Sequence, residues 1–222
     1  MDRKIIGIKE VYQGTQETRE YEFKSGFVWR HPTGASLELV KTMISMLNTP
    51  TGGVIILGIE QQRNNSKIEY KGLLPEQIES FEKNEELIKR ILNGYASISI
   101  SPNFLLIEDS SEKKTFLTIS VPNYKEYPCL IKKDGIFNDK KGSEVFEFRM
   151  GDLFSRSKNP PFSTCKVTQD ELNEMIELCA KGVRTKSMDI LNIKDSDLPN
   201  QKEQIKNKFE EERRKIYGDI QN

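Results

Sequence analysis

Hydrophobic and polar residues near the N-terminus follow two different periods, which predict a strand and then a helix. Tyr21 and Phe23 alternate with Glu22 and Lys24, as in a strand that packs one face against a core. This strand would place Glu22 and Lys24 together on its polar face. Ser36 is a suitable N-cap for the helix that follows. The apolar residues of that helix recur at helical spacing: Leu37, Val40, Ile44 and Leu47.

The middle of the chain continues with elements of both kinds. Turn-forming residues at 48–53 end the helix, and the apolar run 54–57 predicts a buried strand. Residues 75–93 have helical spacing, and 103–108 and 115–121 have the composition of two strands joined by a charged turn. The residues expected in the core of the 75–93 helix are Ile78, Phe81, Leu87, Ile88, Ile91 and Leu92.

The last third of the chain predicts more sheet and then a helix. Residues 129–132 and 145–150 have strand patterns, and the segment 149–160 has the composition of a polar, locally basic loop. Thr168 and Glu171 match a capping box, which opens a helix. The apolar residues at helical spacing in this helix form a stripe typical of a core: Leu172, Met175, Ile176 and Cys179.

Together these elements predict an α+β fold, in which a mixed sheet is flanked by helices and followed by a charged helical tail. We expect one domain over 1–165, a packing helix at 166–182 and a charged helical or flexible tail at 183–222. Residues 201–217 of the tail can form a charged helix, but they contain too few apolar residues for a coiled coil.

Composition narrows the class of protein. The chain has no apolar stretch of about 20 residues and no apolar signal-peptide core, so we expect a cytoplasmic protein without a membrane span. The 3 cysteines are widely spaced and His31 is the single histidine. This pattern argues against a structural zinc site and against histidine-based catalysis, and His31 is expected in a loop. The Gly-x-x-x-x-Gly-Lys-Ser/Thr pattern of a phosphate-binding loop is absent.

Charge limits how the chain can bind nucleic acid. With 34 basic and 34 acidic residues, the formal charge is zero, so the chain has no overall basic footprint. Any contact with nucleic-acid phosphates must come from a local patch. The basic segment 149–160 offers Arg149, Arg156 and Lys158 for that purpose, although such a segment is equally compatible with a surface loop without a ligand.

Two short motifs carry candidate chemistry. The first contains Glu17 and, five residues later, Glu22, which is followed directly by Phe-Lys. The second is the turn 48–53, followed by the apolar strand and then by Glu60. In this order the two motifs resemble those of the Schlafen core domain and of its prokaryotic AlbA-like relatives. The resemblance extends over about residues 10–165, which is enough for one lobe of the two-lobed animal Schlafen core.

The resemblance implies a metal-dependent endoribonuclease that cleaves structured RNA such as tRNA. Glu17, Glu22 and Glu60 would be the three carboxylates that bind Mg²⁺ or Mn²⁺, and many family members carry Asp at the position of Glu60. Lys24 would orient the scissile phosphate or stabilise charge on it. The residues that would position the RNA backbone are Arg149, Arg156 and Lys158.

Other functions fit the same residues. The chain is alternatively a binding module for RNA or DNA without catalysis, in which the glutamates contact neighbouring lysines and arginines. It is also compatible with a subunit of a larger complex that is recruited through the tail at 183–222. A homodimer, or another partner chain, would supply the second lobe of the two-lobe groove.

Overall fold

The computed structural model describes residues 1–12, 14, 16–61, 68–111, 113–124, 127–159 and 162–190. The chain divides into two compact units, Met1–Cys179 and Ala180–Asn222. The predicted boundaries near 165 and 182 stay predictions, and the predicted helix at 201–217 lies outside the described residues. The paragraphs below concern the first unit.

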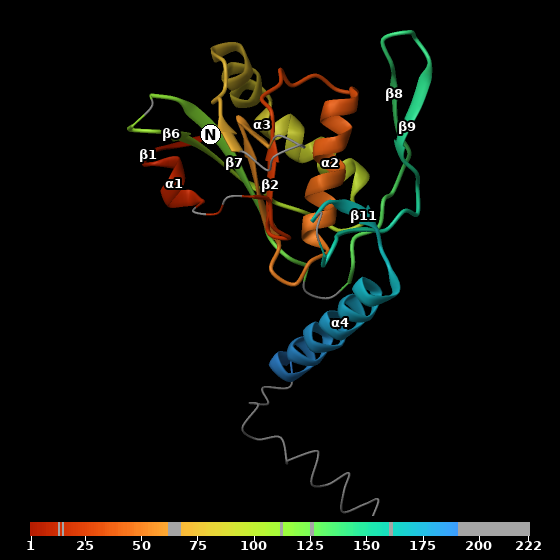
Figure 1. The fold of residues 1–222 in the computed structure, drawn as a ribbon. Coiled ribbons are helices and arrows are strands. Elements are labelled where there is room, and N and C mark those ends of the chain that lie inside the picture. The colour runs from red at the N-terminus through yellow and green to blue at the C-terminus, as the bar shows by residue number, and fades with distance from the viewer. Residues whose placement is uncertain are drawn as a thin grey trace, which may run out of the picture. The chain divides into compact units, whose positions relative to one another are not determined.

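A five-stranded mixed sheet forms the centre of this unit (Figure 1). Its order is β1 (Asp2–Ile5), β6 (Asn103–Glu108), β7 (Thr115–Val121), β3 (Gly53–Leu57) and β2 (Tyr21–Lys24). The outer pairs β1–β6 and β2–β3 are parallel, whereas β6–β7 and β7–β3 are antiparallel. The predicted α+β fold with a mixed sheet is confirmed, and β2 lies at an edge of the sheet.

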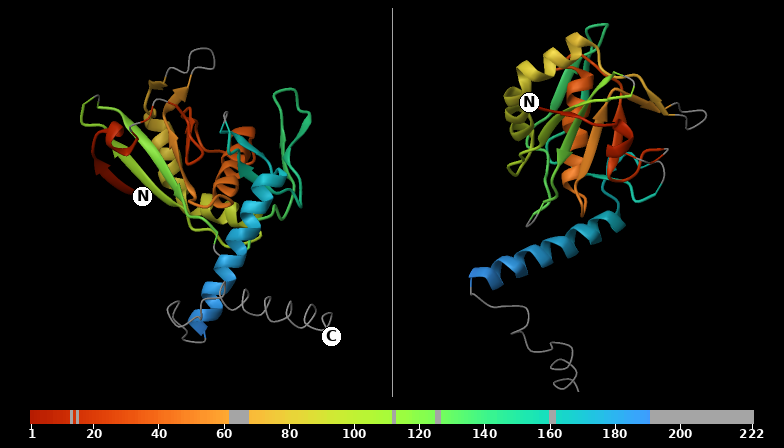
Figure 2. Two further views of the ribbon diagram at one scale, coloured as in Figure 1. Left: turned by 60° about the horizontal axis from the view of Figure 1, so that its bottom comes forward. Right: turned by 90° about the vertical axis from the view of Figure 1, so that its left-hand side faces the viewer.

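Helices cover both faces of the sheet (Figure 2). On one face α2 (Gly34–Leu47) and α3 (Pro75–Tyr95) pack against alternate strand residues such as Ile55. On the other face the short helix α1 (Ile8–Val11) packs against a smaller cluster that includes Ile56. Because neighbouring residues of β3 belong to different clusters, the sheet separates the two apolar cores.

The helix α2 begins earlier than predicted. Thr33, rather than Ser36, is its N-cap, and its side-chain oxygen accepts the Ser36 N–H at 3.2 Å. The Ser36 hydroxyl in turn accepts the Thr33 N–H at 2.9 Å, which completes a capping box. Ser36 is the third helical residue, so it is the second partner of the capping box and not the N-cap residue. The predicted apolar face is confirmed by four fully or almost fully buried side chains: Leu37, Val40, Ile44 and Leu47.

A glycine redirects the chain after β3. Gly58 has φ +100°, and a Cβ there would lie 3.0 Å from the carbonyl carbon of Gly72. The chain then forms β4 (Ile59–Gln61), which pairs antiparallel with β5 (Ile68–Tyr70). The expectation that Glu60 emerges where the buried strand ends is therefore corrected, since Glu60 lies within a second strand.

The segment between the sheet and the last helix folds into two small hairpins. The first consists of β8 (Gly135–Asn138) and β9 (Glu144–Phe148), while the predicted strand at 129–132 makes only an isolated bridge. The second consists of β10 (Phe154–Arg156) and β11 (Thr164–Lys166). The prediction of a loop over 149–160 is wrong for 154–156, which form the buried strand β10 and pair with β11.

The helix α4 (Gln169–Ile190) begins at the predicted capping box. Glu171 accepts the Thr168 N–H at 3.0 Å and also binds the Thr168 hydroxyl. Met175 is buried as predicted, whereas Ile176 is 58% exposed. The buried face of α4 is therefore narrower than the apolar stripe that the sequence predicted. Among the described helices, none is long and apolar enough to cross a membrane.

Candidate functional site

The polar face of edge strand β2 carries the first motif. Phe23 is buried in the cluster on the α1 side of the sheet, so Glu22 and Lys24 face the α2 side. Lys24 Nζ lies 3.1 Å from Glu22 Oε1 and 2.7 Å from Glu38 Oε1, a residue of α2. The predicted pairing of Glu22 and Lys24 on one face is confirmed.

The electrostatic surroundings keep Lys24 charged. Its side chain is only 11% exposed, and this burial acts to lower its pKa. The carboxylates of Glu22 and Glu38 outweigh the burial, so that the pKa of Lys24 is raised. Lys24 is therefore a permanent cation beside Glu22.

Arg156 supplies the second cation. Its side chain is fully buried, and one guanidinium nitrogen binds Glu22 Oε2. The other terminal nitrogen donates to the carbonyl oxygens of Thr18 at 3.1 Å and Tyr21 at 3.4 Å. Both oxygens of Glu22 are thus engaged, one by Lys24 and one by Arg156. We call Glu22, Lys24, Glu38 and Arg156 the Glu22 cluster; its two carboxylates and two cations balance.

The Glu17 side chain accepts a backbone hydrogen bond at the free edge of β2. The carbonyl oxygens of Glu20 and Lys24 accept N–H groups of the neighbouring chain segment, at 2.7 and 2.8 Å, so the intervening Phe23 N–H faces away from β3. Glu17 Oε1 accepts that N–H at 2.8 Å. Burial of the Glu17 carboxyl, followed by the nearby charge of Glu22, raises its pKa. Glu17 is held next to the Glu22 cluster as a carboxyl that resists ionisation.

Glu60 has partners of its own. Its carboxylate pairs with Lys71, and hydrogen bonds from Lys71 and Ser25 lower its pKa. The Glu60 side chain is 35% exposed, unlike those of Glu22 and Lys24. The neighbouring Gln61 accepts the Glu17 N–H at 3.1 Å, which links β4 to the first motif through the backbone.

The three glutamates do not form a metal centre in this arrangement. Within the described residues no group of three or more His, Cys, Asp or Glu side chains is placed to hold a metal ion. Glu22 is bound by two cationic side chains and Glu60 by a third. The donor set therefore does not fit the three-carboxylate Mg²⁺ or Mn²⁺ site that the resemblance implies, and the role of these residues as ligands remains a prediction.

Asn48, in the second motif, was not predicted to have a role. Its buried side chain donates to the carbonyl oxygens of Cys129 at 2.8 Å and Phe154 at 2.9 Å, and it accepts the Cys129 N–H at 2.7 Å. Phe154 begins β10, which carries Arg156. Asn48 therefore fixes the strand whose arginine reaches Glu22. The signal that could have identified it is a polar residue directly after an apolar helix.

Arg19 ties the same region to α4. Its guanidinium makes two hydrogen bonds with Glu174, one of them at 3.1 Å, and its Nε donates to the carbonyl oxygen of Arg156 at 3.2 Å. Lys158 Nζ lies 3.3 Å from the Asp170 carbonyl oxygen and 3.7 Å from Glu174 Oε1. The predicted basic residues thus have different settings, since Arg156 is buried and Lys158 lies at the surface beside α4.

Arg149 lies on neither of these networks. It is exposed directly after β9, with its guanidinium carbon 4.4 Å from the centre of the Phe146 ring. Of the three predicted RNA-contacting residues, Arg149 and Lys158 face solvent and Arg156 does not.

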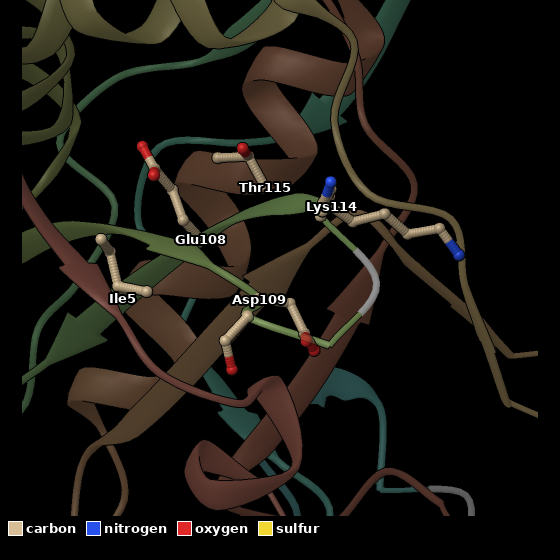
Figure 3. Close-up of a pocket in the computed structure, with 7 residues that line it drawn as sticks. Ile5, Glu108, Asp109, Lys114 and Thr115 are labelled. Carbon is tan, nitrogen blue, oxygen red and sulfur yellow. The ribbon is translucent and has the colours of Figure 1, made fainter.

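A small cavity lies elsewhere on this unit (Figure 3). Its volume is about 220 Å³, below the range of about 300–1,000 Å³ typical of small-molecule sites. Asp109, one of its lining residues, accepts the Ile8 N–H at 3.1 Å and so belongs to the start of α1. None of the predicted site residues lines this cavity. Its lining residues are Ile5, Glu108, Asp109, Ser110, Lys113, Lys114 and Thr115.

Comparison with known families identifies the fold family. A model of the family described as Schlafen, AlbA_2 matches residues 17–153, which include both motifs. The chain belongs to this family. Membership suggests a function related to nucleic acids, and some members of the Schlafen family are nucleases.

Other comparisons are more distant. The crystal structure of the DIP2311 protein from Corynebacterium diphtheriae matches at 18% identity with a TM-score of 0.40. That match covers 71% of this chain and only 23% of the other, so the Schlafen-family chain is similar to a minor part of a longer protein. No curated protein matches the chain.

Proposed function

We propose that this Schlafen-family chain is a binding module for structured RNA such as tRNA. The observation that carries the proposal is the saturation of Glu22 by Lys24 and Arg156. A carboxylate whose charge is balanced in this way does not repel a phosphate, and both cations are occupied in holding the edge strand. The first motif then stabilises the fold, as in the binding-module hypothesis.

Phosphate contacts in this proposal come from basic residues at the surface. Arg149 and Lys158 are both exposed and flank the buried strand β10. Such contacts position a nucleic acid without reading its sequence, and their strength falls steeply with salt. The neutral overall charge is compatible with these contacts because they need only a few exposed basic residues.

The direct test is an electrophoretic mobility assay with purified tRNA and with a DNA duplex of similar length. Retardation of tRNA that weakens as KCl rises supports the proposal. Equal retardation of the DNA duplex would make the chain a general nucleic-acid binder. Absence of any complex with tRNA at low salt would contradict the proposal.

Cleavage of structured RNA is the second candidate function, and Glu17 favours it. A buried carboxyl with a raised pKa, beside a permanently charged lysine, is typical of residues that transfer protons in catalysis. The Mg²⁺ or Mn²⁺ implied by the family finds no matching three-carboxylate set among the described residues, so we derive no step through a metal.

Incubation of total tRNA with the protein in Mg²⁺, Mn²⁺ or EDTA tests this candidate. Discrete fragments that disappear in the Glu17→Gln variant would establish cleavage and the role of Glu17. Cleavage that persists in EDTA would show independence from divalent ions. Intact tRNA in all three conditions would leave binding as the function.

A second copy of the chain completes the binding surface in our proposal. The family resemblance covers one lobe of a two-lobe groove, and a symmetric dimer would supply the other. Light scattering after gel filtration, with and without tRNA, measures the mass of the complex. A single chain per tRNA would contradict a dimeric groove.

A further inference from the structure

The hairpin of β8 and β9 extends outward from the rest of the first unit (Figures 1 and 2). Its base is anchored, because Phe148 is buried and a Cβ on Gly135 would lie 2.4 Å from the Phe148 ring. A register shift between Gly135 and Ile136 interrupts the pairing at this base. On the outer part of β9, Phe146 remains 39% exposed.

The Phe146 ring contacts the guanidinium group of Arg149. The guanidinium carbon of Arg149 lies 4.4 Å from the centre of the Phe146 ring, a cation–π contact between two exposed side chains. The ring packs against the guanidinium and so limits its movement. Arg149 is exposed, so its remaining surface is accessible to a ligand.

Two aspartates of the hairpin region accept hydrogen bonds from its own backbone. Asp139 accepts the backbone N–H groups of Lys141 and Ser143, at 2.8 and 2.9 Å. Asp134 accepts the Met150 N–H at 2.7 Å. A third acidic residue, Glu147, pairs with a lysine of α2. The two aspartates hold the turn and the base of the hairpin, and Glu147 ties it to α2. Glu144 on β9 is exposed.

The lysines of the hairpin are left facing solvent. Lys132, Lys140 and Lys141 are exposed, and no carboxylate in the described part of the chain forms an ion pair with any of them. The hairpin therefore combines exposed lysines with a guanidinium that packs against an aromatic ring. This combination is typical of surfaces that bind unpaired nucleotides, where phosphates meet cations and bases stack on flat groups.

We propose that the β8–β9 hairpin binds an unpaired segment of the RNA. A base stacks on the Arg149 guanidinium, which packs against Phe146, and the adjoining phosphates contact Lys140 and Lys141. The inference rests on the proposed RNA-binding function and specifies the part of the RNA that this surface takes. A single-stranded loop of a structured RNA has the required chemistry, whereas a continuous duplex has no free base to offer.

The test is fluorescence anisotropy with a labelled single-stranded oligouridine and a labelled RNA duplex. Arg149→Lys keeps the charge and removes the planar group, so we expect about a tenfold loss of single-strand affinity with an unchanged salt slope. Phe146→Leu should give a loss of the same order. Arg90→Lys is the matched control, since Arg90 is an exposed arginine of α3.

Loss of the lysines should change the salt dependence of binding as well as the affinity. In the double variant Lys140→Gln/Lys141→Gln, we expect weaker binding together with a shallower dependence of affinity on salt. If the wild type, Arg149→Lys and Phe146→Leu all bind the oligouridine with equal affinity, the hairpin proposal is overturned and the RNA-binding proposal stands. No binding of any RNA, tRNA included, by a folded wild type would overturn the proposed function and the hairpin proposal with it.

Discussion

Arg156 on β10 binds the carboxylate of Glu22 on β2, although 134 positions separate the two residues in the chain. The strand β10 is held in place by Asn48, which donates to the Phe154 carbonyl oxygen and whose own carbonyl oxygen accepts the Ser155 hydroxyl. Each of the two family motifs therefore contributes to one contact: the second motif places the arginine, and the first supplies the carboxylate.

Removal of the arginine should destabilise the fold strongly. In Arg156→Met, Glu22 keeps only Lys24, and three backbone carbonyl oxygens lose the guanidinium as a donor. One of them, that of Tyr21, still accepts the Thr18 N–H. Breaking a buried ion pair in this way costs about 3–5 kcal/mol, which urea unfolding would measure as a lower midpoint. Lys166→Met is the control, because Lys166 is 71% exposed in its pair with Asp152 and its loss should cost less than about 1 kcal/mol. Equal midpoints for the two variants would contradict the structural role of Arg156.

The side-chain amide of Asn48 is expected to be irreplaceable. Asn48→Asp has the same shape but lacks the two N–H groups that the carbonyl oxygens of Cys129 and Phe154 accept. Each buried acceptor left without a donor costs about 1–3 kcal/mol, so the melting temperature should fall by several degrees. Asn173→Asp provides a matched control, since Asn173 is exposed on α4 and uses its oxygen as an acceptor. A melting temperature that stays at the wild-type value would mean that β10 is held by other contacts.

Glu17 should make stability fall with rising pH. Its pKa is raised in the folded state, so between the ordinary pKa of 4.5 and the folded value the native state binds a proton that the unfolded chain has released. Stability is highest below this window and is lost as pH rises through it. We expect Glu17→Gln to lack this loss when unfolding is followed by urea at a series of pH values.

Glu60 should change stability with pH in the opposite direction, and it serves as the comparison for the Glu17 series. Its pKa is lowered by Lys71 and Ser25, so its contribution is present above 4.5 and is lost as pH falls through the lowered folded value. Glu60→Gln should therefore differ from the wild type at neutral pH and converge with it in acid. Parallel pH profiles for the wild type and Glu17→Gln would show that Glu17 titrates normally.

If the chain cleaves RNA, Glu60 should tolerate a shorter acid. The family resemblance implies that Asp can replace Glu at this position, so Glu60→Asp should keep measurable cleavage of tRNA, whereas Glu60→Ala should lose it. The folding of both variants is checked by circular dichroism, and little change is expected because the pair with Lys71 is exposed. Normal cleavage by Glu60→Ala would remove this residue from the site.

Local patterns predicted the parts of the fold that depend on neighbours in sequence. The strands at 103–108 and 115–121 have the predicted bounds, and Glu22 and Lys24 share a face because alternation is a property of any strand. The family itself was recognisable from two motifs. In each case the signal lies within a few consecutive residues.

Long-range contacts account for what the patterns missed. Ser155 and Arg156 have the polarity of a loop, yet they are buried because Asn48 and Glu22 satisfy them from distant segments. The position of Glu60 depends on the turn at Gly58, whose positive φ the sequence alone does not reveal. A charged residue buried against a charged partner has no hydrophobic signature, so pattern analysis assigns it to the surface.

The measurement that tests the central claim most directly is the affinity for labelled tRNA by fluorescence anisotropy, in EDTA, across a series of KCl concentrations. The account predicts saturable binding without divalent ions, with an affinity that falls steeply as KCl rises, because exposed lysines and arginines supply the positive charge. Failure to bind tRNA in EDTA, with binding restored by Mn²⁺ or Mg²⁺ and abolished in Glu22→Gln, would contradict it and would place a metal at the carboxylates instead.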